Sequence, residues 1–163
     1  MTDLGNHARA TSTKGIFRME CAVAINIHAK PTAIWSLLTD AAHMPRWNST
    51  VLNINGHIAP GERIALKSTL DPKRTFKLKV STFDPPSKMV WQDGMAPMFK
   101  GVRTYTLTPQ RDGSTSFTMT ETFTGLMLPL IAKSLPDFKP SFEQFALDLK
   151  QVSERKEYQD SKD

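Results

Sequence analysis

Apolar and polar residues alternate along residues 17–28. Arg18, Glu20, Asn26 and His28 stand between apolar or thiol positions, which are Phe17, Met19, Cys21, Val23, Ile25 and Ile27. A period of two is typical of a strand with one buried face. The pattern predicts such a strand, with Cys21 as a core thiol because nothing in the sequence around it would lower its pKa.

A helical pattern replaces the alternation after residue 30. Pro31 suits the first position of a helix, where its missing N–H costs nothing. Ile34, Trp35, Leu37 and Leu38 follow at helical spacing. We predict a short helix that ends at residues 39–40, followed by a turn or a single helical turn over residues 41–48.

Short alternating segments separated by Gly, Pro and Asp fill the middle of the chain. They predict antiparallel strands over residues 51–55, 63–70, 76–81, 89–92, 102–108 and 115–124. Asp112 and Gly113 lie between the last two strands, and this dipeptide is typical of a hairpin turn.

A long amphipathic helix is predicted at the end of the chain. Its apolar stripe has spacings of four and three residues and consists of Phe138, Phe142, Phe145, Leu149 and Val152. Strands segregated from helices indicate an α+β fold, in which this helix covers the apolar face of an antiparallel sheet of about six to seven strands.

Composition bounds the rest of the picture. The 163 residues carry a net charge of +5 and one Cys, with no apolar stretch long enough to cross a bilayer and no apolar leader near the start. We expect a disordered segment over residues 1–15, a single domain over 16–157, a tail over 158–163 and a cytoplasmic location.

Basic residues are concentrated in one part of the chain, opposed only by Asp71: Lys67, Lys73, Arg74, Lys77 and Lys79. Because no aromatic side chains that stack on bases are interleaved with them, we interpret them as the solvated face of a hairpin and expect no nucleic-acid partner. The isolated histidines and the absence of nucleotide-binding glycine loops give no metal site and no cofactor.

The register of the last hairpin follows from its apolar faces. If both apolar sets face the same side, the turn at Asp112 pairs Leu107 with Phe117, Tyr105 with Met119, and Arg103 with Glu121. A dry ion pair is costly, so Arg103 and Glu121 are better explained beside a wet or ligand-filled cavity than in a packed core. Three roles stay open for the pair: strand register, ligand contact, or acid–base catalysis.

The sequence resembles the START-like superfamily called SRPBCC, in particular its polyketide cyclase/dehydrase and lipid-transport members. The matching positions are Pro31, Trp35, Asp40, Pro45, Trp47, Asn48, Gly56 and Gly61, with further similarity over residues 89–91, 101–105 and 120–125. The resemblance implies a helix-grip fold, in which a curved sheet wraps around a long C-terminal helix and encloses an apolar cavity. The family has no universal catalytic motif, so the resemblance assigns no catalytic residue.

A hydrophobic or amphipathic small molecule, lipid- or polyketide-like, is the expected ligand of that cavity. The candidate ligand-binding residues are Trp91, Phe99, Arg103, Tyr105, Met119, Glu121, His43 and Phe142. The first alternative is a polyketide cyclase or dehydratase in which Glu121, Arg103, Tyr105 or His43 moves protons. The second alternative is a protein-interaction module resembling chaperone activators.

The apolar segment 126–135 has two readings. It is either a flexible portal that admits ligand and makes transient membrane contact, or a first helical turn packed on the sheet. For the oligomeric state we expect a monomer or a homodimer.

Overall fold

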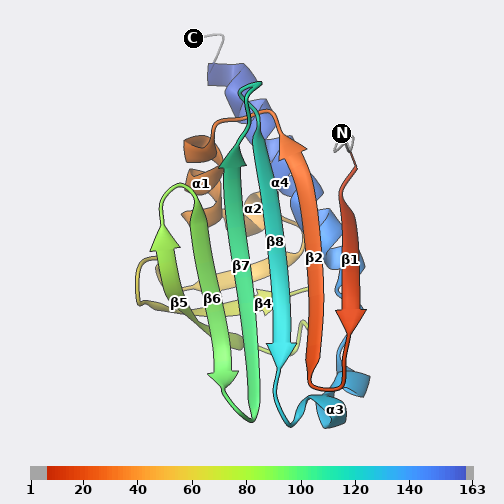
Figure 1. Ribbon diagram of the computed structural model, residues 1–163. Coiled ribbons are helices and arrows are strands. Elements are labelled where there is room, and N and C mark those ends of the chain that lie inside the picture. The colour runs from red at the N-terminus through yellow and green to blue at the C-terminus, as the bar shows by residue number, and fades with distance from the viewer. Residues whose placement is uncertain (1–6, 161–163) are drawn as a thin grey trace.

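One antiparallel sheet of eight strands organises the chain. The computed structural model describes residues 7–160, and the strand order in its sheet is β1-β2-β8-β7-β6-β5-β4-β3. The strands are β1 (Arg9–Lys14), β2 (Arg18–Ile27), β3 (Val51–Asn55), β4 (Arg63–Ser68), β5 (Phe76–Asp84), β6 (Lys88–Met95), β7 (Phe99–Pro109) and β8 (Thr115–Thr124). Figure 1 shows the long strands β2, β8, β7 and β6 side by side at the centre.

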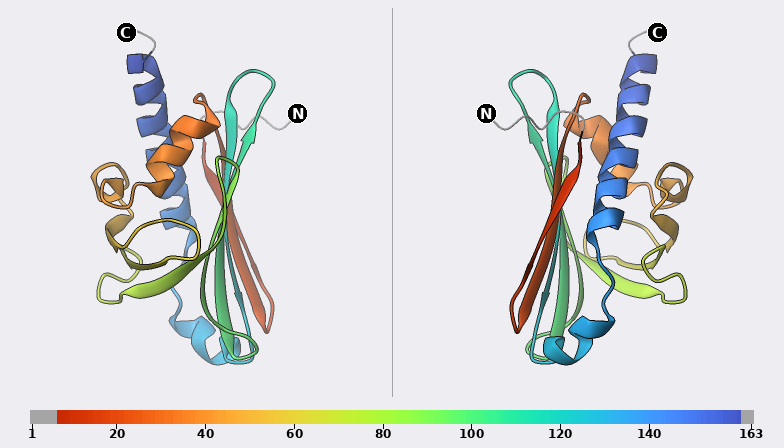
Figure 2. Two further views of the ribbon diagram at one scale, coloured as in Figure 1. Left: turned by 90° about the vertical axis from the view of Figure 1, so that its left-hand side faces the viewer. Right: turned by 90° about the vertical axis from the view of Figure 1, so that its right-hand side faces the viewer.

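The helices lie on one face of this sheet. They are α1 (Pro31–Thr39), α2 (Met44–Trp47), α3 (Leu128–Ile131), the 3₁₀ turn η1 (Ala132–Ser134) and α4 (Lys139–Asp160). Figure 2 shows the sheet edge-on, with α4, α1 and α2 together on the same side. The α+β prediction is confirmed, and the short helix begins at Pro31 as expected.

The sheet is strongly curved. Its register shifts between Val80 and Thr82, where β5 pairs with β6, and again between Val51 and Asn53 in β3. Such irregularities bend a strand and increase its twist. As Figure 2 shows, the β3–β5 end of the sheet consequently curls toward the side that carries α4.

The strand count is higher than predicted because residues 1–15 are not wholly disordered. Arg9–Lys14 form β1, an edge strand paired along its whole length with β2. Only Ala10 in β1 is buried, so no alternation marks this strand in the sequence. Backbone pairing holds it instead, and Glu143 of α4 accepts a hydrogen bond from the Ala10 N–H at 2.9 Å.

The predicted chain ends differ from the structure in one further respect. Helix α4 continues to Asp160, so the tail expected from residue 158 is helical over its first three positions. Residues 1–6 and 161–163 of the two predicted terminal segments lie outside the described residues.

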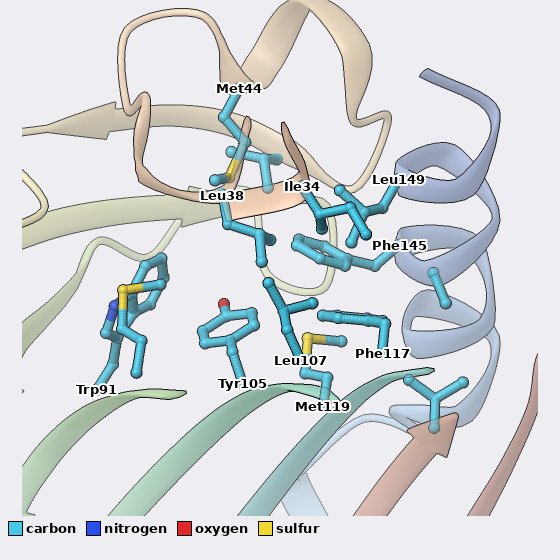
Figure 3. Packing of buried hydrophobic residues seen from close by; sticks show 14 of the residues in the cluster. Ile34, Leu38, Met44, Trp91, Tyr105, Leu107, Phe117, Met119, Phe145 and Leu149 are labelled. Carbon is cyan, nitrogen blue, oxygen red and sulfur yellow. The ribbon is translucent and has the colours of Figure 1, made fainter. Parts of the chain in front are cut away.

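The core fills the half of the sheet that lies beneath α1 and α2. Figure 3 shows side chains of β6, β7 and β8 pointing toward those of α1, α2 and α4. From α4 the core receives Phe142, Phe145, Ala146 and Leu149, which confirms three of the five positions of the predicted stripe. Of the other two, Phe138 precedes α4 and Val152 is only partly buried. Phe17 is the exception among the predicted inward positions of the first strand, since 52% of it is exposed in the β1–β2 connection.

Candidate functional site

A partly enclosed pocket of about 210 Å³ lies between the curved sheet and the segment that precedes α4. The central strands contribute Phe99, Gly101, Arg103, Glu121 and Phe123 to its lining. The curled end of the sheet contributes apolar side chains, among them Leu66, Phe76 and Leu78, together with the charged residues Asp71 and Arg74. The covering segment adds Ile131, Ser134, Leu135, Pro136 and Phe138. The space beneath α4 itself is filled by the core, and the open space lies beside it, under the segment that precedes the helix.

An ion pair lies in the lining of this largely apolar pocket. Arg103 and Glu121 are direct partners across β7 and β8, as the predicted register requires. The Arg103 Nε–H donates to Glu121 Oε2 at 2.6 Å, and the two side chains are only 16% and 12% exposed. Burial alone would lower the pKa of Arg103, but the adjacent carboxylate outweighs it and holds that pKa above its ordinary value. The pair is thus charged and mostly withdrawn from water.

The pair keeps hydrogen-bonding capacity toward the pocket. Among the described residues, Glu121 Oε1 makes no hydrogen bond, and the nearby Tyr105 hydroxyl adds to the interactions that raise the pKa of Arg103. A methyl group built on Gly101 would lie 3.7 Å from Glu121 Oε1 and 3.2 Å from the Phe123 ring. The missing side chain of Gly101 therefore leaves open the space into which the carboxylate faces. The Glu121 carboxylate, an acceptor, and the Arg103 guanidinium, a donor, therefore lie side by side in the lining of a largely apolar pocket.

Aromatic rings form the wall on one side of the pair. Phe99 stacks on Phe123 with ring centres 5.7 Å apart, and Phe123 contacts Phe138 at 5.4 Å. Phe138 continues the row to Phe142, whose ring lies 5.3 Å below the Arg103 guanidinium. The row links the sheet to the start of α4, so it positions the guanidinium and supplies apolar contact area together.

The covering segment separates two spaces. A second cavity of about 360 Å³ lies on the β1–β2 side of the segment, lined in part by Met19, Cys21 and Lys139. Both cavities are lined by Phe123, Leu135, Pro136 and Phe138. Residues 135–138 consequently form a partition between the two spaces.

Three of the eight predicted site residues line the pocket: Phe99, Arg103 and Glu121. Trp91, Tyr105 and Met119 lie instead in the packed core, each about 1% exposed, and Figure 3 shows all three pointing toward the helices. Burial raises the pKa of Tyr105, partly offset by the charge of Arg103, so its hydroxyl stays protonated. The Tyr105 hydroxyl and Trp91 Nε1 find no hydrogen-bond partner among the described residues.

Phe142 and His43 are also outside the pocket lining. Phe142 is fully buried beneath Arg103, so it supports the pair from behind. His43 precedes α2, has a side chain 55% exposed, and places Nδ1 2.7 Å from Asp40 Oδ2. The structure thus does not bring His43 together with Glu121.

Sequence reasoning missed the walls that come from distant segments. The alternation in β4 and β5 marks Leu66, Phe76 and Leu78 as inward-facing, but it carries no information about which part of the sheet they face. Ile131 and Leu135 belong to the apolar segment whose role was left open. Within that segment Leu128 is completely buried, whereas Leu130 is 75% exposed.

Cys21 behaves as a core thiol. It is 5% exposed, and burial, reinforced by the charge of Asp137, raises the pKa of the thiol to about 11. A protonated, buried thiol is a poor nucleophile. The interpretation of Cys21 as a packing residue is consistent with this environment.

The family comparison agrees with the fold and the cavity. The model of the family described as "Polyketide cyclase / dehydrase and lipid transport" matches residues 18–154. The chain belongs to this family. The match spans β2 through most of α4, and so includes both walls of the pocket and the ion pair. A search of the curated proteins finds no match to the sequence.

Solved structures show the same architecture at low sequence identity. A START superfamily protein from Mycobacterium smegmatis superposes with a TM-score of 0.60 and 15% identity, covering 83% of this chain and 97% of its own. A hypothetical protein from Helicobacter pylori gives a TM-score of 0.64 and 13% identity, with 91% and 90% covered. Protein MLL2253 from Mesorhizobium loti gives 0.62 and 21%, with 82% and 97% covered. These likenesses establish the START-like fold.

The described helices offer no candidate for crossing a bilayer, since none combines sufficient length with an apolar composition.

Proposed function

We propose that this protein binds an amphipathic small molecule, lipid- or polyketide-like, in the pocket lined by Arg103 and Glu121. The observation that carries the proposal is a nearly buried ion pair in the lining of a largely apolar pocket, with one carboxylate oxygen that has no hydrogen-bond partner among the described residues. A ligand group that both donates and accepts hydrogen bonds, such as a hydroxyl beside a carbonyl, complements that arrangement. The rest of the ligand replaces water along the apolar lining.

The size of the pocket favours a compact ligand body. An empty apolar cavity of about 150 Å³ accommodates benzene, and the pocket here is larger, at about 210 Å³. One or two fused rings, or a short acyl chain, would fit without moving the partition at residues 135–138. A longer chain would extend into the neighbouring cavity of about 360 Å³ once that partition shifts.

Binding is better supported than the two alternatives. For a cyclase or dehydratase, the candidates to move protons were Glu121, Arg103, Tyr105 or His43, and of these Glu121 and Arg103 line the pocket. Tyr105 is buried outside the lining and His43 is exposed near Asp40. A chaperone-activator role calls for a filled interior, whereas the described residues enclose an unfilled one.

Paired ligands test the proposal. β-Naphthol and naphthalene share an apolar body and differ by one hydroxyl, so their affinities for the purified protein isolate the polar contact. We expect wild-type protein to bind β-naphthol about fivefold to tenfold more tightly than naphthalene, as one net hydrogen bond of about 1 kcal/mol implies. Isothermal titration calorimetry measures both affinities.

Glu121→Gln and Glu20→Gln provide the matched comparison, because Glu20 pairs with Arg18 and lines the neighbouring cavity but not the pocket that holds a compact ligand. We expect Glu121→Gln to reduce the preference for β-naphthol and Glu20→Gln to preserve it. If both variants showed the same preference for β-naphthol over naphthalene, the ion pair would not be part of the binding site. Failure of wild-type protein to bind either compound would reject the pocket as a site for ligands of this size.

A further inference from the structure

Exposed apolar side chains collect at one end of the molecule. Among the described residues, seven large hydrophobic side chains are exposed, and six of them lie in or next to three connections between elements. The β1–β2 connection carries Ile16 and Phe17, Met95 ends β6 and Met98 precedes β7, and Leu126 and Leu130 lie before and within α3. Figure 1 shows these connections at the end of the sheet opposite to both chain termini.

Backbone hydrogen bonds fasten the three connections into one surface. The Gly125 N–H donates to Phe17 O at 3.1 Å, and the Leu126 N–H donates to Pro97 O at 3.0 Å. Gly125 has a φ of +133°, and a side chain there would collide with the Met98 carbonyl. Glycine is therefore required where the connections meet. The exposed side chains form a fixed patch, which we call the apolar end, and such patches mark interaction surfaces.

A cationic groove adjoins the apolar end. The groove is about 290 Å³ in volume and is lined by Met95 together with Arg63, Lys77, Lys79 and Lys100. Arg63 and Lys79 are direct partners across β4 and β5, and like charges placed opposite each other destabilise a sheet. No salt bridge among the described residues neutralises these four cations, and Asp93 is the one carboxylate in the lining.

Further charges around the patch have the same overall sign. Lys14 at the end of β1 and Lys133 in η1 are exposed, while Arg18 is paired with Glu20 and Asp137 lies within the covering segment. The surroundings of the apolar end thus carry more cations than carboxylates. An anionic partner would relieve the repulsion that the fold maintains in the groove.

We propose that the apolar end docks on the surface of an anionic lipid bilayer. Apolar side chains on separate turns would enter the interfacial region, and the flanking cations would face the headgroup phosphates. A bilayer fits this surface because it accepts several projecting apolar tips at once and supplies diffuse negative charge. Docking would also bring the pocket cover to the membrane, since Leu130 and Ile131 are adjacent and Ile131 lines the pocket. The proposal rests on this surface and is independent of what the pocket binds.

Vesicle flotation tests the apolar contribution. Wild-type protein should float with phosphatidylcholine vesicles that contain phosphatidylglycerol, and Leu130→Asp should lower the bound fraction about tenfold by placing a charge at the interface. Leu52→Asp is the matched control, because Leu52 is the seventh exposed hydrophobic residue and lies on β3, 47% exposed. Leu128 is unsuitable for this purpose because it is fully buried.

A charge series tests the cationic contribution. Lys79→Glu, which places a carboxylate in the groove, should weaken binding to vesicles with phosphatidylglycerol. Lys88→Glu is the matched control and should not weaken binding, because Lys88 begins β6 and does not line the groove. Added salt should weaken wild-type binding, and vesicles of phosphatidylcholine alone should bind less protein than the anionic vesicles.

Several outcomes would overturn the proposal: no flotation of wild-type protein, equal loss in Leu130→Asp and Leu52→Asp, or binding indifferent to phosphatidylglycerol. A concentration-dependent dimer that Leu130→Asp abolishes, without vesicle binding, would assign the apolar end to a second copy of the chain instead. A urea unfolding transition of Leu130→Asp like that of wild type serves as the folding control. Because this control does not depend on what the pocket binds, a failure of docking is separated from a failure of the proposed function.

Discussion

Replacing both charges of the pocket pair separates stability from binding. In the double variant Arg103→Met with Glu121→Leu, two apolar side chains take the place of an ion pair whose members are 16% and 12% exposed. Each single variant leaves one nearly buried charge without its partner. Breaking a fully buried pair costs about 3–5 kcal/mol. Because some water reaches this pair, we expect about 2 kcal/mol of destabilisation for each single variant.

The double variant should behave differently from the sum of its parts. Replacing a buried ion pair by apolar residues is often neutral or stabilising, so its free energy of unfolding should lie within about 1 kcal/mol of wild type. The expected non-additivity is therefore about 3 kcal/mol. Urea denaturation measures all four proteins, and similar m-values would show that the unfolded states are comparable.

A second pair on the same sheet gives the control cycle. Arg18 and Glu20 form an exposed pair, with side chains 60% and 32% exposed, and their variants should change stability by less than about 1 kcal/mol each, with near additivity. If the double variant at positions 103 and 121 instead lost the sum of the two single effects, the pair would be a stabilising register contact and the reasoning from desolvation would be wrong. Loss of the preference for β-naphthol in a stable double variant would show that the charges serve binding.

The remaining predictions concern the pocket, the core thiol and a bridge at the end of α4. Gly101→Ala should weaken β-naphthol binding about tenfold in calorimetry. The reason is that the added methyl group would lie 3.2 Å from the Phe123 ring, and overpacking costs about 1–3 kcal/mol. Unchanged affinity would mean that the ligand does not occupy this part of the pocket. The Cys21 thiol, with its pKa raised to about 11, should react with Ellman's reagent at pH 8 about two orders of magnitude more slowly than in the urea-unfolded chain, and equal rates would contradict its burial. Burial disfavours the charged form of Glu154, but hydrogen bonds from Lys150 Nζ and the His28 N–H outweigh it and lower the pKa of this carboxyl. Its stabilising contribution is thus present above the unfolded pKa of about 4.3 and lost as pH falls below it. Glu154→Gln should therefore flatten the acid side of the stability profile measured by urea denaturation, and an unchanged profile would exclude this carboxyl as a contributor.

The sequence predicts what depends on local periodicity. The pairing of Arg103 with Glu121 follows from the alternation on two strands and the turn at Asp112, because a shift of one residue would expose the apolar face. The first turns of α1 follow from Pro31 for a similarly local reason. These features need no knowledge of where other elements lie.

Features set by tertiary placement were missed. Strand β1 carries one buried residue, Ala10, and is held by backbone pairing that leaves no pattern in the sequence. Tyr105 and Arg103 share a face of β7, yet one lies in the packed core and the other in the pocket. They differ in their position along the strand. Where the packed core ends along β7 depends on where α1 and α4 lie on the sheet. The wall from Leu66 and Leu78 likewise depends on the bend of β5, which alternation alone does not reveal.

Native mass spectrometry of protein purified from its own host measures occupancy of the pocket directly. We expect wild-type protein to carry a discrete non-covalent adduct with the mass of a small amphipathic compound. The Arg103→Met, Glu121→Leu double variant, purified in parallel, should carry little or none of it. A wild-type spectrum that shows only the bare polypeptide, or an adduct equally abundant in both proteins, would contradict a site built around the ion pair.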